Sequence, residues 1–272
     1  MKTFVIILGL FLTNISFAST IIVDQYGNGQ FKSIQPAIDA ASSNDTVKVW
    51  PGQYFEQVTL NKNITLMGSG YENTTITGGF NPTITVSSGR LQWFTISSTV
   101  GVGINMSAGV VKNCVVNACA TNGIVITSGT SSSILNCIIV NNGTYGVSTN
   151  SSTTVSVTNC ISISNGNYGF CAYGSGSILN LSYSDGSTYY TTGSKGCINV
   201  DPSFTSITDF HISESSPCWD KGNPTITDPD GSNSDMGYFG GTDCPIYPTV
   251  FEILITPNGG TVNLTAKGRA NY

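Results

Sequence analysis

Short runs of alternating apolar and polar residues follow one another along most of the chain, with Gly, Pro and Asn between them. Thr46–Val49, Val58–Leu60 and Thr83–Val86 are examples, and all three are built largely from Val, Ile, Leu and Thr. Alternation with a period of two is typical of a strand with one buried face, and β-branched residues favour strands. The pattern therefore predicts an all-β protein made of many short strands.

A repeat of 23 residues runs through the middle of the chain. Asn-Cys pairs begin at Asn113, Asn136 and Asn159, and a Gly followed by an apolar residue returns ten residues after each pair. A period just above 20 is typical of a solenoid whose turns stack with equivalent residues in register. The repeat therefore predicts a β-solenoid.

The cysteines of the repeat are expected to be free. Equivalent residues on adjacent turns lie about 4.8 Å apart, and stacked thiols pack there as small hydrophobic side chains. This column holds Cys114, Cys137 and Cys160. Outside it, Cys197 and Cys218 are the candidate disulfide pair in a chain expected to be exported.

The two ends of the chain differ from the repeat. Residues 1–18 carry Lys2, an apolar run and a small-x-small pattern ending at Ala18, which predicts a secretory signal peptide. Phe31–Ala41 has apolar residues three to four apart and predicts an amphipathic helix that caps the first turn. No other stretch has the apolar length of a transmembrane segment.

We divide the remainder at residue 244. Residues 19–244 are predicted to form the solenoid. In the tail, residues 245–272, two strand-like runs flank Pro257–Gly260, which predicts a β-hairpin. The tail either packs on the solenoid or is the start of a truncated module.

The N-terminal part resembles a known family. Phe31–Ala41, Pro51–Val58 and Asn63–Gly70 are similar to the opening of pectin methylesterases, in the pectin-lyase-like right-handed parallel β-helix superfamily. The resemblance implies a right-handed parallel β-helix. The segment from Val200 to Gly241 is similar to the closing segment of secreted bacterial β-helix repeat proteins. This similarity implies that the segment forms the C-terminal end of the coil.

The resemblance also implies a role for the repeated asparagines. In this superfamily, asparagine ladders satisfy backbone groups at tight bends and bond to their equivalents on the next turn, which suits the need of buried backbone groups for partners. The implied structural ladder is Asn113, Asn136, Asn159 and Asn180.

The charges limit the chemistry. Only 9% of residues are charged and the net charge is −5, which argues against nucleic acid or an anionic membrane surface as partner. No Asp or Glu lies between Glu72 and Asp185. The enzymes of the superfamily use carboxylates on their central turns, and acid–base catalysis needs a titratable side chain within reach. The Asp-Phe and Leu-Gly-Arg-Pro-Trp motifs of the esterases are also missing.

Three candidate sites remain. Tyr145 and Tyr168 share one phase of the repeat, so they either stack on sugar rings or shield a turn. His211 lacks a matched base or nucleophile and is interpreted as structural. A Gly-containing loop could bind Ca²⁺ or form plain turns through its aspartates. These are Asp228, Asp230 and Asp235.

We therefore expect a secreted, periplasmic or cell-surface β-helix protein that binds or presents to polysaccharide without catalysis. One alternative is a polysaccharide lyase, hydrolase or esterase with an atypical site, in which Glu56 acts with Glu72 or Asp185 with Asp201. A second alternative is a structural stalk or adhesin module.

Overall fold

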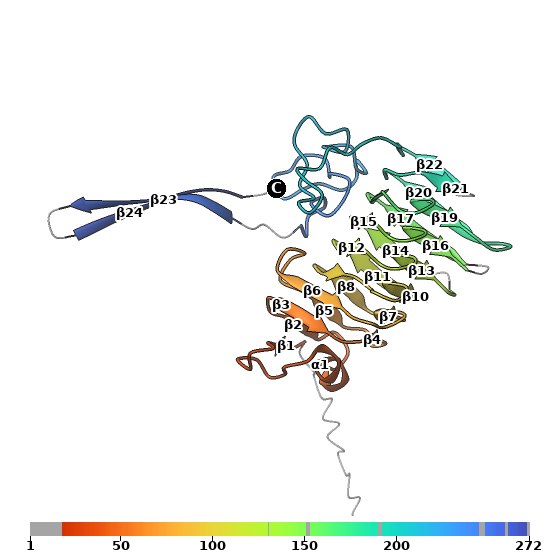
Figure 1. The fold of residues 1–272 in the computed structure, drawn as a ribbon, viewed down its shortest axis with the longest axis horizontal. Helices are drawn as coiled ribbons and strands as arrows, with labels where there is room; N and C mark the ends of the chain where they lie inside the picture. The colour runs from red at the N-terminus through yellow and green to blue at the C-terminus, as the bar shows by residue number, and fades with distance from the viewer. Residues whose placement is uncertain are drawn as a thin grey trace, which may run out of the picture.

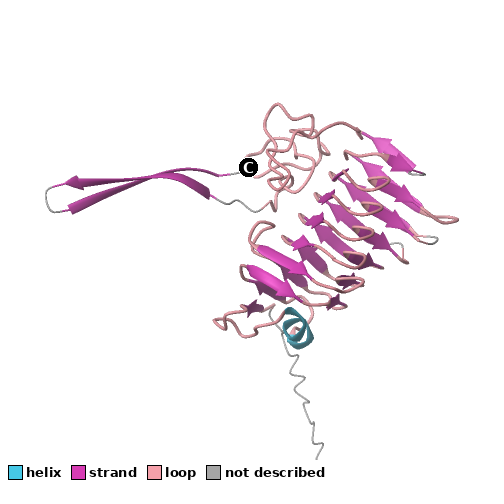
Figure 2. Cartoon of the chain, viewed as in Figure 1, coloured by secondary structure: helices cyan, strands magenta, loops and turns pink. Residues whose placement is uncertain are grey.

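Three parallel sheets wind around one core in the computed structural model (Figures 1 and 2). It describes residues 18–129, 131–150, 153–189, 192–244, 248–258 and 261–270. Successive strands pass from one sheet to the next and then return to the first, so the chain forms a right-handed parallel β-solenoid. This confirms the predicted all-β fold. Residues 1–17 of the predicted signal peptide lie outside the described residues.

Each complete turn contributes one strand to each sheet, and the turns at the two ends contribute fewer. Sheet A consists of β1 (Thr20–Val23), β2 (Thr46–Val49), β5 (Thr65–Met67), β8 (Arg90–Gln92), β11 (Gly109–Lys112), β14 (Ser132–Leu135), β17 (Thr154–Thr158), β20 (Ile178–Ser182) and β22 (Thr192–Lys195). Sheet B consists of β3 (Gly52–Phe55), β6 (Thr74–Thr77), β9 (Thr95–Ile96), β12 (Val115–Asn117), β15 (Ile138–Val140) and β18 (Ile161–Ile163). Sheet C consists of β4 (Val58–Leu60), β7 (Ile84–Val86), β10 (Ile104–Met106), β13 (Ile124–Ile126), β16 (Val147–Thr149), β19 (Phe170–Ala172) and β21 (Thr188–Tyr189).

The inner core is built from columns of equivalent apolar residues. In sheet C, Ile84, Ile104, Ile124, Val147 and Phe170 pair in register along the stack, and all five are fully buried. Each such side chain contributes roughly 1.5–3 kcal/mol by its removal from water. Every turn must stack its inward-pointing side chains on the equivalent side chains of the turn before it. This requirement produces the period of the repeat.

One helix, α1 (Ile34–Ala40), covers the first turns, as predicted. It buries Ile34, Ala37 and Ile38 in the inner core. The Glu56 carboxylate accepts hydrogen bonds from the backbone N–H groups of Ile34 and Gln35. These are donors that a helix leaves unpaired at its start, and a negative charge is favourable there. Glu56 therefore serves the helix.

The tail contains the predicted hairpin. β23 (Pro248–Asn258) and β24 (Thr261–Ala270) pair antiparallel as a separate two-stranded sheet. Both strands extend beyond the runs Val250–Ile255 and Thr261–Ala266 that the sequence pattern predicts. No helix within the described residues has the length and apolar composition that crossing a membrane requires.

The segment 200–244, here called the covering segment, corrects one expectation. It does not continue the coil but folds back along the outer face of sheet B, where Figure 1 shows it beside the strands. There Val115, Ile138 and Ile161 form an outward apolar column, and aromatic residues of the covering segment pack on it. The outer cluster buries Phe210, Met236, Tyr238 and Phe239. β12 and β15 of sheet B are therefore buried on both faces, as strands with consecutive apolar residues require.

Candidate functional site

The repeated asparagines lie at the bend between sheets A and B. Asn113, Asn136 and Asn159 are fully buried and have φ angles of 43°, 49° and 54°. Asn tolerates this left-handed region better than most residues do, because its short polar side chain can hydrogen-bond locally. The bend therefore requires asparagine for its backbone shape before any side-chain contact is counted.

Their side chains hold the covering segment against sheet B. The Asn136 Nδ2 group donates to the carbonyl oxygens of Asp235 (3.3 Å) and Gly237 (3.4 Å). The Asn113 amide donates to two further carbonyl oxygens of the segment, and the Asn159 Oδ1 atom accepts from the Asn223 N–H at 2.7 Å. The asparagine side chains therefore form hydrogen bonds with the covering segment. These bonds take the place of the asparagine-to-asparagine bonds that the resemblance implies.

Asn180 does not belong to this column, contrary to the expectation. It is exposed in β20, in register with Ser156 of β17. Tyr183, with φ 47°, takes the position after Asn159, and Ser184 follows it in place of a Cys. This turn is 24 residues long rather than 21, so counting from the sequence selects the wrong residue. An amide-to-amide bond does occur at another bend, where Asn142 Nδ2 donates to Asn165 Oδ1 at 2.9 Å.

The column cysteines are free and fully buried. Burial raises the pKa of the Cys114 and Cys160 thiols well above the usual range, so both stay protonated and pack as apolar groups. Cys197 and Cys218 are also free thiols, so the expected disulfide is wrong in this structure. The reason is their placement: Cys197 packs against the inner core, whereas Cys218 belongs to the outer cluster and donates to Asp185 Oδ2.

The aspartates proposed for calcium serve the covering segment itself. Asp228 is buried and its carboxylate accepts the N–H groups of Asp235 and Gly241. Burial raises the pKa of Asp228 to about 6 and that of Asp235 to about 7. Asp230 is exposed and bonds Ser232. Within the described residues, these three carboxylates do not converge as a ligand group.

The two tyrosines lie on neighbouring turns, as their shared phase predicts. The Gly146 N–H donates to the Tyr168 carbonyl at 3.0 Å, and the Gly123 N–H donates to the Tyr145 carbonyl at 2.9 Å. Tyr168 is 37% exposed and Tyr145 is half-buried. Both precede strands of sheet C, on a different part of the surface from the covering segment.

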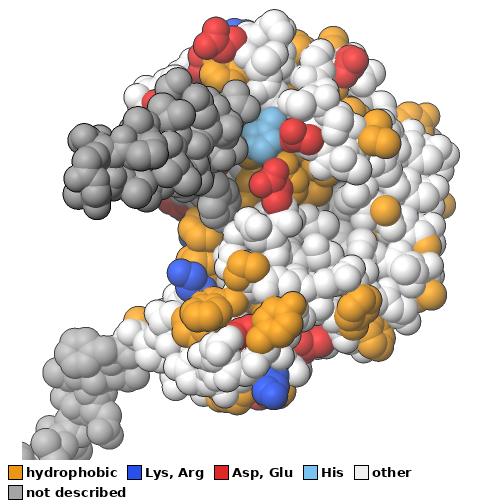
Figure 3. Space-filling model, turned by 60° about the vertical axis from the view of Figure 1, so that its left-hand side comes forward, with side chains coloured by type: hydrophobic (Ala, Val, Ile, Leu, Met, Phe, Trp, Pro, Cys, Tyr) orange, Lys and Arg blue, Asp and Glu red, His pale blue; other side chains and the backbone are white. Residues whose placement is uncertain are grey.

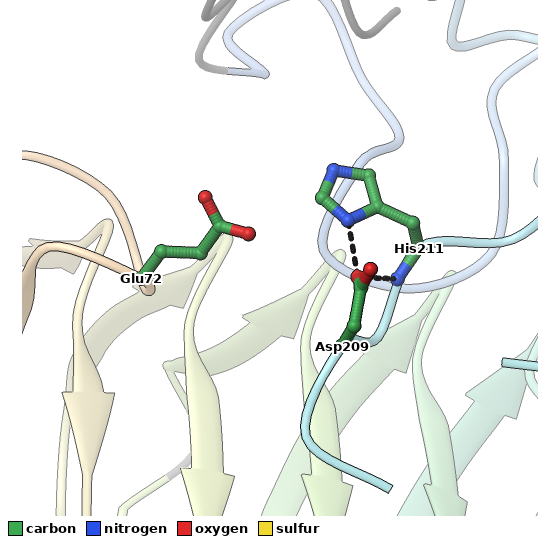
Figure 4. Close-up of side chains that lie close together, drawn as sticks. All are labelled: Glu72, Asp209 and His211. Atoms are coloured by element: carbon green, nitrogen blue, oxygen red, sulfur yellow. Dashed lines mark hydrogen bonds and ion pairs between the residues drawn. The ribbon is translucent and has the colours of Figure 1, made fainter. Parts of the chain in front are cut away.

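A group that the sequence interpretation missed is formed by Glu72, Asp209 and His211. Their ligand atoms all lie within 4.8 Å of one another, and Figure 4 shows the Glu72 carboxylate facing the Asp209–His211 pair. Glu72 lies in the turn before β6, and the other two lie in the covering segment. The His211 Nδ1 atom lies 2.5 Å from Asp209 Oδ1. Docking of the covering segment therefore assembles this group.

Neighbouring side chains orient the group. The His211 ring stacks on Phe239, with centroids 4.1 Å apart and 27° between the planes. The Tyr71 hydroxyl donates to Glu72 Oε1 at 3.2 Å. Burial, and then the nearby Glu72 charge, raise the pKa of Tyr71 well above its usual range, so the hydroxyl keeps the proton that it donates.

The pairings considered from sequence differ from those in the structure. Glu56 binds the start of α1, so it does not act with Glu72. Asp185 is fully buried and accepts a hydrogen bond from the Val200 N–H. Burial raises the pKa of Asp185, and repulsion by the nearby Asp201 charge raises it further. The useful sequence signal was Asp209 and His211 two residues apart, because alternate residues of an extended segment point the same way.

A pocket of about 290 Å³ lies between the end of sheet B and the covering segment. Phe210, whose sequence neighbours are Asp209 and His211, forms part of its wall. In Figure 3 the histidine lies at a hollow in this face, beside acidic side chains. The lining combines polar and apolar side chains: Asn141, Ser164, Asp201, Ser203, Ser206, Val140, Ile163, Phe204 and Ile207.

Comparisons with known proteins agree with this architecture. The sequence profile described as a right handed beta helix region matches residues 31–186. A search of curated proteins gives no match. Among solved structures, the chain is similar to a pectin methylesterase from Aspergillus niger, with 17% identity and a TM-score of 0.49 over 74% of this chain and 92% of that one. The carrot pectin methylesterase gives 13% identity and 0.48 over 71% and 87%.

A pectin methylesterase mutant in complex with a hexasaccharide gives 14% identity and a TM-score of 0.45, over 68% of this chain and 66% of that one. This chain thus spans slightly less than two thirds of that protein. At these identities the likeness concerns the fold alone.

Proposed function

Because this chain belongs to the right-handed β-helix family, whose stacked turns present long outer faces, we propose that it is an exported protein that binds polysaccharide on one such face. The observation that carries the proposal is the pocket between sheet B and the covering segment. Its volume of about 290 Å³ is close to the lower end of small-molecule sites.

The pocket lining suits a sugar ring. Sugars combine apolar C–H faces with hydroxyl groups at their edges, so a site for them needs both kinds of surface. Ile207 and Phe204 supply apolar contact area, while Asn141 and Ser203 offer an amide and a hydroxyl. Asp201 adds a carboxylate, which accepts from sugar hydroxyl groups and repels an acidic polymer. A neutral, hydroxyl-rich polysaccharide therefore fits best.

The rest of the surface supports binding without catalysis. The central turns carry no carboxylate between Glu72 and Asp185, so their outer faces lack the acid–base groups that cleavage of a glycosidic bond uses. Export is an expectation from the N-terminal segment and part of the proposal. A long polymer could contact both the pocket and the neighbouring turns.

We expect pocket variants to weaken binding about 5- to 30-fold, corresponding to roughly 1–2 kcal/mol per lost contact. Asn141→Gly removes the amide while keeping the backbone at its φ of 56°, and Ile207→Ser removes an exposed apolar side chain. Affinity for a panel of neutral and acidic polysaccharides would be measured by titration calorimetry. Tyr26→Ala is the control, since Tyr26 is 78% exposed in the N-terminal turn.

Three results would contradict the proposal. If the folded protein binds no polysaccharide, the function is wrong. If Tyr168→Ala abolishes binding while both pocket variants bind normally, the site is the tyrosine pair on the sheet C side. New reducing ends or unsaturated uronates that disappear in Asp209→Asn would show catalysis in place of simple binding.

A further inference from the structure

We propose that Glu72, Asp209 and His211 bind a divalent transition-metal ion, with Zn²⁺ as the preferred ion. The three side chains come from two segments far apart in sequence, which meet only because the covering segment docks on sheet B. The proposal goes beyond polysaccharide binding and does not depend on it.

The geometry needs little adjustment. A tetrahedral Zn²⁺ with ligands at about 2.0–2.1 Å holds its ligand atoms roughly 3.3 Å apart. In this group the ligand atoms lie within 4.8 Å of one another. Glu72 is exposed, so its side chain can rotate toward the pair, and His211 Nδ1 and Asp209 Oδ1, now 2.5 Å apart, would separate slightly around the ion.

The donor set selects the kind of ion. Ca²⁺ and Mg²⁺ prefer sites made of oxygen atoms, whereas an imidazole nitrogen suits Zn²⁺ and its neighbours in the first transition series. Two carboxylates balance the charge of a divalent ion. Three protein ligands leave one tetrahedral position for water or a ligand. The group therefore has the composition of an open zinc site.

The surroundings already hold the ligands in place. Tyr71 donates to Glu72, Phe239 stacks on the His211 ring, and the backbone N–H of His211 donates to Asp209 Oδ1 at 3.1 Å. Such supporting contacts orient metal ligands and strengthen binding. An ion here would join the turn before β6 to the covering segment, so metal binding should also stabilise the docked segment.

The test uses the full mature protein, freed of metal with a chelating resin. We expect titration calorimetry to detect one Zn²⁺ per chain, and Co²⁺ to give the intense visible absorption of a tetrahedral complex. Glu72→Gln and His211→Ala should each weaken Zn²⁺ binding about 100-fold, and Tyr71→Phe about 10-fold. Zn²⁺ in excess should raise Tm by roughly 4 °C in the wild type.

Asp230→Asn is the matched control, because Asp230 is an exposed carboxylate of the covering segment outside the group. It should bind Zn²⁺ as the wild type does. Glu72→Gln keeps the result interpretable if His211→Ala unfolds, since Glu72 is exposed. Equal Zn²⁺ affinity in the wild type and Glu72→Gln, no binding to the wild type, or tighter binding of Ca²⁺ than of Zn²⁺ would overturn the proposal.

Discussion

Replacing Asn136 with Ala is expected to lower the free energy of unfolding by about 2–4 kcal/mol, as measured by urea denaturation. The amide donates to the buried carbonyl oxygens of Asp235 and Gly237, and its loss leaves them without this donor. Ala must also adopt a φ of 49°, which costs roughly 1 kcal/mol. The expected loss of stability is moderate because the buried Asn136 Oδ1 atom has no hydrogen-bond partner within the described residues. The substitution removes this unsatisfied acceptor, which offsets part of the loss.

Two further variants separate these contributions. Asn136→Gly removes the amide but permits the positive φ, so the difference between the Gly and Ala variants measures the backbone cost. Asn180→Ala is the control, since Asn180 is an exposed asparagine of β20, and its effect should stay within about 0.5 kcal/mol. Equal losses in Asn136→Ala and Asn180→Ala would show that the buried column does not hold the covering segment.

Stability is expected to fall as pH rises from about 4 to about 7. Burial raises the pKa of Asp235 to about 7 and that of Asp228 to about 6, from an ordinary value of 3.8, and the two charges repel each other. The folded protein therefore holds these protons more tightly than the unfolded chain does. Their contribution is complete below pH 4 and is lost as pH rises through the folded values, by on the order of 4 kcal/mol for Asp235.

Other carboxylates make the protein less stable at low pH. Hydrogen bonds from backbone N–H groups hold the pKa of Asp45 below 3.8, and the bond from Lys112 does the same for Asp243. Their stabilisation is present above pH 4 and is lost as pH falls through the lowered values. Maximal stability should therefore lie near pH 4–5.

Asp235→Asn tests this balance. Asn can still accept the Asp220 N–H but carries no charge, so the decline between pH 5 and pH 8 should become shallower and the variant should exceed the wild type at pH 8. Glu214→Gln, at an exposed position of the same segment, should retain the wild-type slope. Thermal unfolding at several pH values measures both. A wild type that becomes more stable from pH 5 to pH 8 would contradict the raised pKa values of Asp228 and Asp235.

The solenoid was predictable because its cause is local and repeated. Every turn must place the same residue types at the same inward positions and bends, so Asn113, Asn136 and Asn159 mark the period directly. The error at Asn180 arose where a turn lengthens to 24 residues and the pairing of β20 with β22 becomes irregular. A fixed period fails wherever a loop between strands changes length.

The candidate site was not predictable in the same way, because it depends on docking between distant segments. The consecutive apolar residues Val115–Val116 and Ile138–Val140 are typical of strands buried on both faces, but the sequence does not show which segment covers them. Only the docked covering segment brings His211 to Glu72. The lack of carboxylates in the repeat holds for the central turns only. It therefore gave no indication of the group formed by Glu72, Asp209 and His211.

Native-state hydrogen exchange, followed by mass spectrometry, tests most directly whether the covering segment is docked on sheet B and so builds the site. We expect peptides from residues 234–241 to exchange as slowly as those from β12 and β15, because these residues are buried and Met236 and Gly237 donate backbone hydrogen bonds there. Asn136→Ala should speed exchange in this segment and leave β10 and β13 unchanged. Exchange of residues 234–241 at the rate of exposed loops in the wild type would contradict docking of the covering segment on sheet B.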